Sequence, residues 1–208
     1  MKREVIDRSE ADPLRRPLHR HFNRMHGELR HEPGKMRWPS EAQARGAVYI
    51  GNKDYRDLRG TTWADVRRVL KNEKHAIEAW ELKGGWPVSW PLIPSVQAWA
   101  NANDGMDLGV TAATYALAAA GGVPLISCNG GAFGGRHFDP LPCIGLWWRT
   151  EVLQPLLECV EHAGMSTWMD HDGIIVIGGD YIRRFLLLAE ALHDRRKAFD
   201  RLVDVKAG

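Results

Sequence analysis

The chain has 208 residues, of which 44 % are hydrophobic and 26 % are charged, and its formal net charge at neutral pH is +2. This composition is typical of a globular domain that buries a core without disulfides or a structural metal. A charge so close to zero does not by itself indicate nucleic-acid binding. The sequence has neither an apolar N-terminal signal nor a membrane-length apolar run, and three cysteines are too few for a disulfide framework, so we expect a soluble, cytoplasmic protein.

The first 45 residues differ from the rest of the chain. They are rich in Arg and His, poor in apolar residues and interrupted by Pro13, Pro17, Pro33 and Pro39. This pattern predicts a basic N-terminal arm over residues 1–45, followed by a single domain over 46–208. A basic arm also attracts polyanions, so nucleic acid or a protein partner is a candidate for this segment.

The first half of the predicted domain contains a short strand, a long helix and an extended connection. Thr61 or Thr62 can cap the helix, and Asp65 lies in its first turn. Prolines at positions 87, 91 and 94 argue against a regular strand in the connection. These three segments are predicted over residues 47–50, 62–82 and 86–96.

From residue 104 the pattern alternates between helices and pairs of strands. Asp104 or Asp107 is the predicted N-cap of a helix rich in alanine, and Gly121-Gly122 ends it. Asp172-Gly173 is a favoured hairpin turn, and Asp180 is the predicted N-cap of the last helix. Short connections between strands predict an α+β fold, with a mixed or largely antiparallel sheet and helices mainly on one face. The order is helix, strand, strand, helix, strand, strand, helix, over residues 108–120, 123–128, 143–148, 151–163, 166–169, 174–177 and about 180–201.

The most informative segment for function is the glycine-rich loop at 128–139. Glycines at the end of a strand let the backbone approach a ligand and present N–H groups to an anion. The loop also carries a thiol, an imidazole and a carboxylate, the groups of a nucleophile, a base and an orienting acid. We therefore take Cys128, His137 and Asp139 as candidate catalytic residues. The candidate ligand-binding residues are Asn129, Gly130, Gly131, Gly134, Gly135, Arg136 and, for stacking on a planar group, Trp148.

Other interpretations of the same residues stay open. Cys128 at the end of a strand is equally a small buried hydrophobic residue. His137, Asp139, Cys143 and His171 are metal-ligand types, but none of the strong zinc spacings occurs, so no metal or cofactor is assigned. A second anion site is conceivable at Gly178-Gly179-Asp180, where a helix begins.

Taken together, the sequence predicts a ligand-binding α+β protein, with or without catalysis, that acts on a small anionic or nucleotide-like substrate at loop 128–139. The alternative is a non-catalytic adaptor that binds nucleic acid or a protein through the basic arm and the basic C-terminal helix, where Arg195, Arg196, Lys197 and Arg201 cluster.

Overall fold

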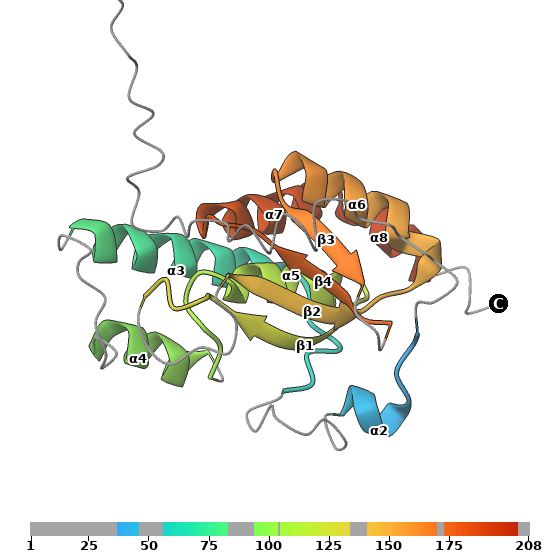
Figure 1. Cartoon of the computed structure of the whole chain (residues 1–208), viewed down its shortest axis with the longest axis horizontal. Coiled ribbons are helices and arrows are strands. Elements are labelled where there is room, and N and C mark those ends of the chain that lie inside the picture. The colour runs from blue at the N-terminus through green and yellow to red at the C-terminus, as the bar shows by residue number, and fades with distance from the viewer. Residues whose placement is uncertain are drawn as a thin grey trace, which may run out of the picture.

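The computed structural model describes residues 37–45, 56–82, 94–103, 105–133, 141–169 and 173–203. These residues form helices and a four-stranded antiparallel sheet, which confirms the predicted α+β class (Figure 1). The helices are α2 Glu41–Ala44, α3 Trp63–Leu82, α4 Pro94–Ala102, α5 Thr111–Ala119, η3 Thr150–Val152, α6 Leu153–His162, α7 Arg183–Asp194 and α8 Arg196–Val203. The strands are β1 Val123–Cys128, β2 Cys143–Trp147, β3 Ser166–Met169 and β4 Ile175–Gly178.

The sheet has the strand order β1-β2-β4-β3, and every pair of neighbours is antiparallel. Its strands lie within about one residue of the predicted ranges. The ladder between β1 and β2 pairs Val123 with Trp147 at one end and Cys128 with Cys143 at the other, with an irregularity at Leu125. Strand β2 is therefore central, and β1 forms one edge of the sheet.

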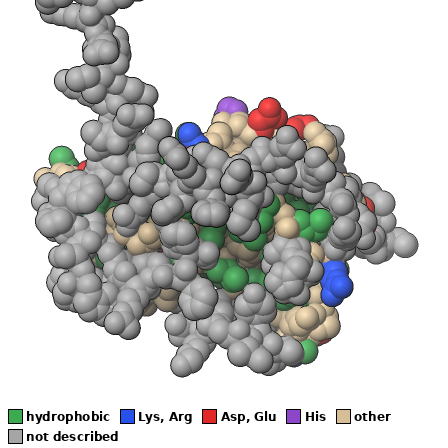
Figure 2. All heavy atoms as spheres, viewed as in Figure 1, with side chains coloured by type: hydrophobic (Ala, Val, Ile, Leu, Met, Phe, Trp, Pro, Cys, Tyr) green, Lys and Arg blue, Asp and Glu red, His purple; other side chains and the backbone are tan. Residues whose placement is uncertain are grey.

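The two faces of the sheet bury different partners. One face carries Ile144, Leu146, Ile175 and Ile177 into the main core formed with the helices, and α5 lies behind the sheet in Figure 1. Side chains alternate along a strand, so the opposite face carries a second cluster. That cluster consists of Val123, Leu125, Trp147 and Ile174 together with Ala44 of α2. Hydrophobic side chains are visible on this second face in Figure 2.

Helix α5 is the centre of the helical layer, in contact with α3, α7 and β1. Its small side chains are almost all buried, as the alanine-rich sequence predicts. Gly121 (φ 94°) ends the helix, and its N–H donates to the carbonyl of Ala118 while the N–H of Gly122 donates to that of Leu117. These two bonds form a Schellman motif. A Cβ at Gly122 would lie 2.7 Å from the Trp148 ring, so both glycines are required.

The start of α3 is also as predicted. The Oγ1 of Thr62 accepts a hydrogen bond from the N–H of Asp65, and the Oδ2 of Asp65 accepts one from the N–H of Thr62. This reciprocal pair is a capping box. Helix α6 begins at Leu153, with Pro155 in its first turn, and ends before Gly164 (φ 65°).

Four predicted features differ from the structure. Asp180 does not cap the last helix, because α7 begins at Arg183 and has Ile182 as its N-cap, with no side-chain cap hydrogen bond. Residues 94–102 form α4 instead of continuing an extended connection, because Pro94 stands at the first helical position, where its missing N–H costs nothing. The predicted last helix is two helices in the structure, since α7 ends at Asp194, with Arg195 as its C-cap, and α8 begins at Arg196. The carboxylate of Asp107 does not cap α5, which begins at Thr111. The predicted strand at 47–50, Asp104 and Asp172 lie outside the described residues.

The described end of the predicted arm, residues 37–45, contacts the sheet domain. Ala44 is buried in the second cluster, the N–H of Arg37 donates to the carbonyl of Gly173, and the guanidinium of Arg149 lies 4.6 Å from the centre of the Trp38 ring. Among the described helices, none combines the length and apolar character needed to cross a bilayer.

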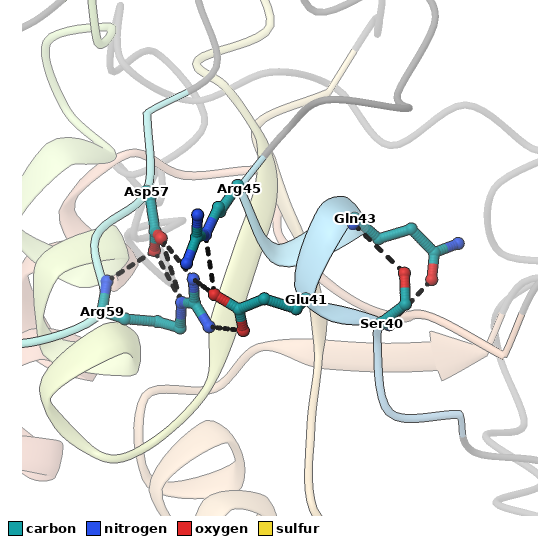
Figure 3. Close-up of polar contacts among 6 residues, drawn as sticks. All are labelled: Ser40, Glu41, Gln43, Arg45, Asp57 and Arg59. Carbon is teal, nitrogen blue, oxygen red and sulfur yellow. Dashed lines mark hydrogen bonds and ion pairs between the residues drawn. The ribbon is translucent and has the colours of Figure 1, made fainter.

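An exposed ion cluster joins α2 to the segment before α3 (Figure 3). Arg59 bonds the carboxylate of Asp57 at 2.6 Å and that of Glu41 at 2.8 Å, and Arg45 bonds Glu41 at 2.8 Å. The hydrogen bond from Arg59, followed by that from Arg45, lowers the pKa of Glu41 to about 2. Since these side chains are largely in solvent, we expect the cluster to add little to stability.

Candidate functional site

A buried carboxylate organises the region behind the glycine-rich loop. Glu73, in the middle of α3, accepts hydrogen bonds from the backbone N–H groups of Gly109 (2.7 Å), Thr111 (3.1 Å) and Ala112 (2.8 Å). These are N–H groups at and just before the first turn of α5, which have no partner within the helix. Glu73 therefore caps α5 from another helix, and its charge lies at the positive end of the helix dipole.

Complete burial gives the carboxyl group of Glu73 an unusually high pKa. The side chain has no solvent exposure, and burial raises its pKa from 4.5 to about 7 even though the backbone donors of Ala112, Gly109 and Thr111 act in the opposite direction. Near neutral pH Glu73 thus exchanges between a carboxylate that caps α5 fully and a neutral acid that has fewer lone pairs to offer.

Further contacts fix the beginning of α5. The indole N–H of Trp99 in α4 donates to the Oγ1 of Thr111 at 3.2 Å, and that hydroxyl donates to the carbonyl of Asp107 at 2.8 Å. Gly109 has a φ of 99°, and a Cβ there would lie 2.8 Å from Ile182. The beginning of α5 is accordingly fixed by α3, α4 and close packing; we call Glu73, Trp99 and residues 107–112 the capping cluster.

Asn129 connects the glycine-rich loop to the capping cluster. Its backbone N–H donates to the Oδ2 of Asp107 at 3.1 Å, and its Nδ2 donates to the carbonyl of Leu108 at 3.0 Å. Its Oδ1 accepts the N–H of Gly131 at 3.0 Å. Asn129 is buried, and two bonds of its side-chain amide together with one of its backbone N–H hold this segment in one position. The turn 128–133 therefore begins from a rigid base.

The backbone conformation of this turn requires glycine at positions 130 and 131. Gly130 (φ 61°) and Gly131 (φ 75°) both have left-handed backbone, and a Cβ at Gly130 would lie 2.7 Å from the backbone of Leu141. The N–H of Gly130 donates to the Sγ of Cys128 at 3.3 Å, and that of Gly131 to Asn129. Because both donors have internal partners, an anion bound here would take its main contacts from groups later in the loop.

Cys128 ends β1 with a buried side chain, as do the other two cysteines, Cys143 and Cys159, and none of the three forms a disulfide. Cys128 and Cys143 are directly opposite one another in the ladder between β1 and β2. The structure thus brings together two of the predicted chemical residues, Cys128 and Cys143, at the base of the loop.

The remaining loop residues of the candidate site lie outside the described residues. These are Gly134, Gly135, Arg136, His137 and Asp139, together with His171 and Asp172 of the predicted hairpin. Within the described ranges, no group of three His, Cys, Asp or Glu side chains has the arrangement of a metal site.

Trp148 differs from its predicted role as a ligand contact. Both Trp147 and Trp148 are buried. The Trp148 ring lies against Gly122 and packs edge-on to Phe199 of α8, with 6.1 Å between ring centres. Helix α8 therefore lies against the indole that would have to stack on a planar ligand, and among the described residues this side chain is only 2 % exposed.

The turn at Gly178-Gly179-Asp180 also has internal partners. The N–H of Gly179 donates to the carbonyl of Pro142 at 3.2 Å. Asp180 is buried, and its Oδ1 lies 3.1 Å from the guanidinium of Arg184, one turn along α7. A carboxylate already stands at the start of this helix, so a second anion would meet a like charge there.

Several basic side chains of the C-terminal helices are paired with acids. Arg183 bonds Glu81 of α3, and Arg195 bonds Glu158 of α6. The guanidinium of Arg196 donates to the carbonyl of His193. Of the basic cluster that the adaptor interpretation uses, Arg195 is therefore paired with an acid and Arg196 is bonded to a carbonyl.

Sequence reasoning did not identify Glu73, although a signal was present. The buried residues of α3 are Val66, Val69, Glu73, Ile77 and Trp80, so the glutamate stands on the apolar stripe at helical spacing. A single acidic residue on such a stripe indicates a buried partner. Its partner could not be found in this way, because the capped N–H groups lie 36 to 39 residues further along the chain.

Comparisons with protein-family models, with curated proteins and with solved structures found no match for this chain.

Proposed function

We propose that the chain binds a small anionic or nucleotide-like ligand at loop 128–139. The observation that carries this proposal is the rigid attachment of the turn 128–133 to the capping cluster through Asn129. A binding loop needs a fixed base to hold its contacts in place. Burying an amide and using two left-handed glycines is costly for a simple connection between adjacent strands.

Arg136 is the residue we assign to the anionic group of the ligand. It follows Gly134-Gly135 in the sequence, and a guanidinium binds phosphate or carboxylate oxygens with two parallel hydrogen bonds. The N–H groups of Gly130 and Gly131 have partners in the turn, so the proposal relies on Arg136 and His137 for affinity.

Catalysis at this loop would require a reactive Cys128. His137 would take up the thiol proton and Asp139 would orient the imidazole. The burial of the Cys128 side chain, which is 6 % exposed, favours non-covalent contact over attack on a substrate. The covalent version predicts rapid, pH-dependent alkylation of Cys128 in the folded protein. A thiol that reacts only after unfolding would rule that version out.

Isothermal titration calorimetry with inorganic phosphate, pyrophosphate and nucleoside triphosphates tests the binding proposal. We expect one member of this series to bind, and Arg136→Gln to weaken it at least about tenfold, as for loss of a charge-assisted hydrogen bond. Arg67→Gln is the matched control, because Arg67 is an exposed arginine of α3 and its loss changes the net charge equally.

The same measurements distinguish a ligand site at loop 128–139 from the adaptor interpretation. Equal loss of affinity in both variants would indicate a general effect of charge and contradict a site at loop 128–139. Salt-dependent binding of an oligonucleotide that disappears on removal of residues 1–45 would support the adaptor instead.

A further inference from the structure

The row of residues that crosses the sheet at its Cys128 end is chemically unusual. From β1 to β3 the register aligns Cys128, Cys143, Gly178 and Ser166. Directly opposite residues in antiparallel strands project their side chains from the same face. Ile144, next to Cys143, faces the helices, so both thiols lie on the opposite face of the sheet.

The spacing of such a pair suits a covalent link. Residues directly opposite in antiparallel strands have Cα atoms about 4.5 to 5.5 Å apart, and disulfides occur over Cα separations of about 4.4 to 6.8 Å. The backbone N–H of Gly130 donates to the Sγ of Cys128 at 3.3 Å, which holds that sulfur in place beside the ladder.

The third cysteine provides an internal contrast. Cys159 is fully buried in α6 within the main helical core, and burial raises the pKa of its thiol to about 11. It therefore has almost no thiolate at neutral pH, and only the thiolate reacts with oxidants or disulfides. Cys128 and Cys143 are also well covered, with 6 % and 5 % exposure, so only a small oxidant is expected to reach them.

We propose that Cys128 and Cys143 form a redox-active dithiol that a hydroperoxide converts into a cross-strand disulfide. One thiolate attacks the O–O bond of the hydroperoxide, becomes a sulfenic acid and releases an alcohol, or water from hydrogen peroxide. The second thiolate attacks the sulfenic sulfur, forms the S–S bond and expels hydroxide, which leaves as water after protonation. The two thiols lose two electrons, which the peroxide gains, and a small dithiol reverses the modification.

The position of these two cysteines would let the disulfide affect the proposed ligand loop. Cys128 and Cys143 bracket residues 129–142, which contain Arg136, His137 and Asp139. A disulfide would add a covalent link between the two ends of this segment, which the ladder between β1 and β2 already pairs. This regulatory consequence rests on the proposed ligand site, whereas formation of the disulfide does not, so the two are tested separately.

Peptide mapping tests the disulfide directly on the full chain. The cysteines fall on three different tryptic peptides, 84–136, 137–149 and 150–183. The reduced protein is treated with hydrogen peroxide, its remaining thiols are blocked with iodoacetamide, and it is unfolded and digested. We expect peptide 84–136 linked to peptide 137–149, a loss of two hydrogen atoms from the intact mass, and full recovery of both thiols with dithiothreitol.

Single-cysteine substitutions identify which two cysteines form the disulfide. Cys159→Ala should leave the cross-linked pair unchanged, whereas Cys143→Ala and Cys128→Ala should each abolish it. Each variant's far-ultraviolet circular dichroism is compared with that of the parent. Over-oxidation of Cys128 or Cys143 without a link, or links that involve Cys159 in folded protein, would overturn the proposal. So would thiols that stay fully reduced under peroxide until the protein is unfolded.

The regulatory consequence is tested with the phosphate and nucleotide series on reduced and oxidised protein. Ligand binding that changes at least about threefold in the parent and not in Cys143→Ala would support it. If the disulfide forms and the reduced protein binds none of these ligands, the ligand site fails while the dithiol stands.

Discussion

Two glutamates of this chain are held by several donors and yet behave oppositely. Glu73 accepts three backbone N–H groups in the protein interior, and its pKa rises to about 7. Glu41 accepts hydrogen bonds from two guanidinium groups at the surface, where its side chain is 59 % exposed, and its pKa falls to about 2 (Figure 3). Burial is the main cause of the raised pKa of Glu73, whereas the cationic donors Arg59 and Arg45 are the main causes of the lowered pKa of Glu41.

The comparison shows where the fold depends on a polar contact. Loss of a surface ion pair is compensated by water, whereas loss of a buried acceptor leaves donors without any partner. The capping cluster around Glu73 should therefore dominate stability, and the exposed ion cluster should be almost dispensable. The predictions below test this difference.

The largest effect is expected for Glu73→Ala. This change leaves three buried N–H groups at the start of α5 without an acceptor, and we expect it to lower the free energy of unfolding by about 3 kcal/mol or more. Urea denaturation measures it. Glu73→Gln keeps one acceptor oxygen and should cost clearly less, and Glu78→Ala, on the exposed side of the same helix, should stay within about 0.5 kcal/mol.

The second prediction concerns pH. The pKa of Glu73 is about 7 in the folded protein and near its ordinary 4.5 when unfolded, so the folded state binds more protons between these values. The free energy of unfolding should therefore fall as pH rises from about 4.5 to about 7, by up to roughly 3 kcal/mol from this group. Denaturant titrations at several pH values measure the slope, and Glu73→Gln should remove this component.

Glu41 should make stability depend on pH in the opposite direction and over a lower pH range. Its folded pKa lies below the ordinary value, so its contribution is present above about pH 4.5 and is lost as pH falls toward 2. A slope between pH 5 and 7 that persists in Glu73→Gln would show that some other group is responsible.

Asn129→Ala is expected to have an intermediate effect. It removes one buried donor and one buried acceptor, which serve Leu108 and Gly131, and we expect a loss of about 2 kcal/mol. It should also weaken the binding of any ligand at loop 128–139, since the turn loses its side-chain attachment to Leu108 and keeps only the backbone bond to Asp107. Unchanged affinity in a destabilised variant would separate the turn's structural role from binding.

The smallest effect is expected for Glu41→Ala. The carboxylate bonds Arg45 and Arg59 in solvent, and we expect the midpoint of thermal unfolding to move by less than about 2 °C. Differential scanning calorimetry at low and high salt checks this. A larger shift would mean that the exposed cluster holds α2 on the sheet, contrary to the comparison above.

The parts of the fold that could be predicted are those that depend on residues close together in the sequence. The Thr62–Asp65 capping box, the Gly121-Gly122 helix end and the four strands are encoded by neighbouring residues, and the structure has them close to the predicted positions. The prolines of residues 86–96 predict an extended connection, whereas Pro94 begins α4, because a proline is also suited to the first turn of a helix.

The candidate site was only partly predictable. The glycine pairs and Asn129 identify a special turn, but its partners Asp107 and Leu108 stand 21 or 22 residues earlier, and no local pattern links them. The burial of Trp148 against Phe199 depends on how α8 docks, and the sequence around Trp148 alone does not contain this information.

The most direct test of the proposed function is a nitrogen-15 NMR titration of the reduced, full-length protein with phosphate and nucleoside triphosphates. Binding at the proposed site predicts saturable chemical-shift changes concentrated at Gly130–Phe133 and continuing to Asp139, and their loss in Arg136→Gln. Changes confined to the first 45 residues or to α8, or none at millimolar ligand, would contradict it.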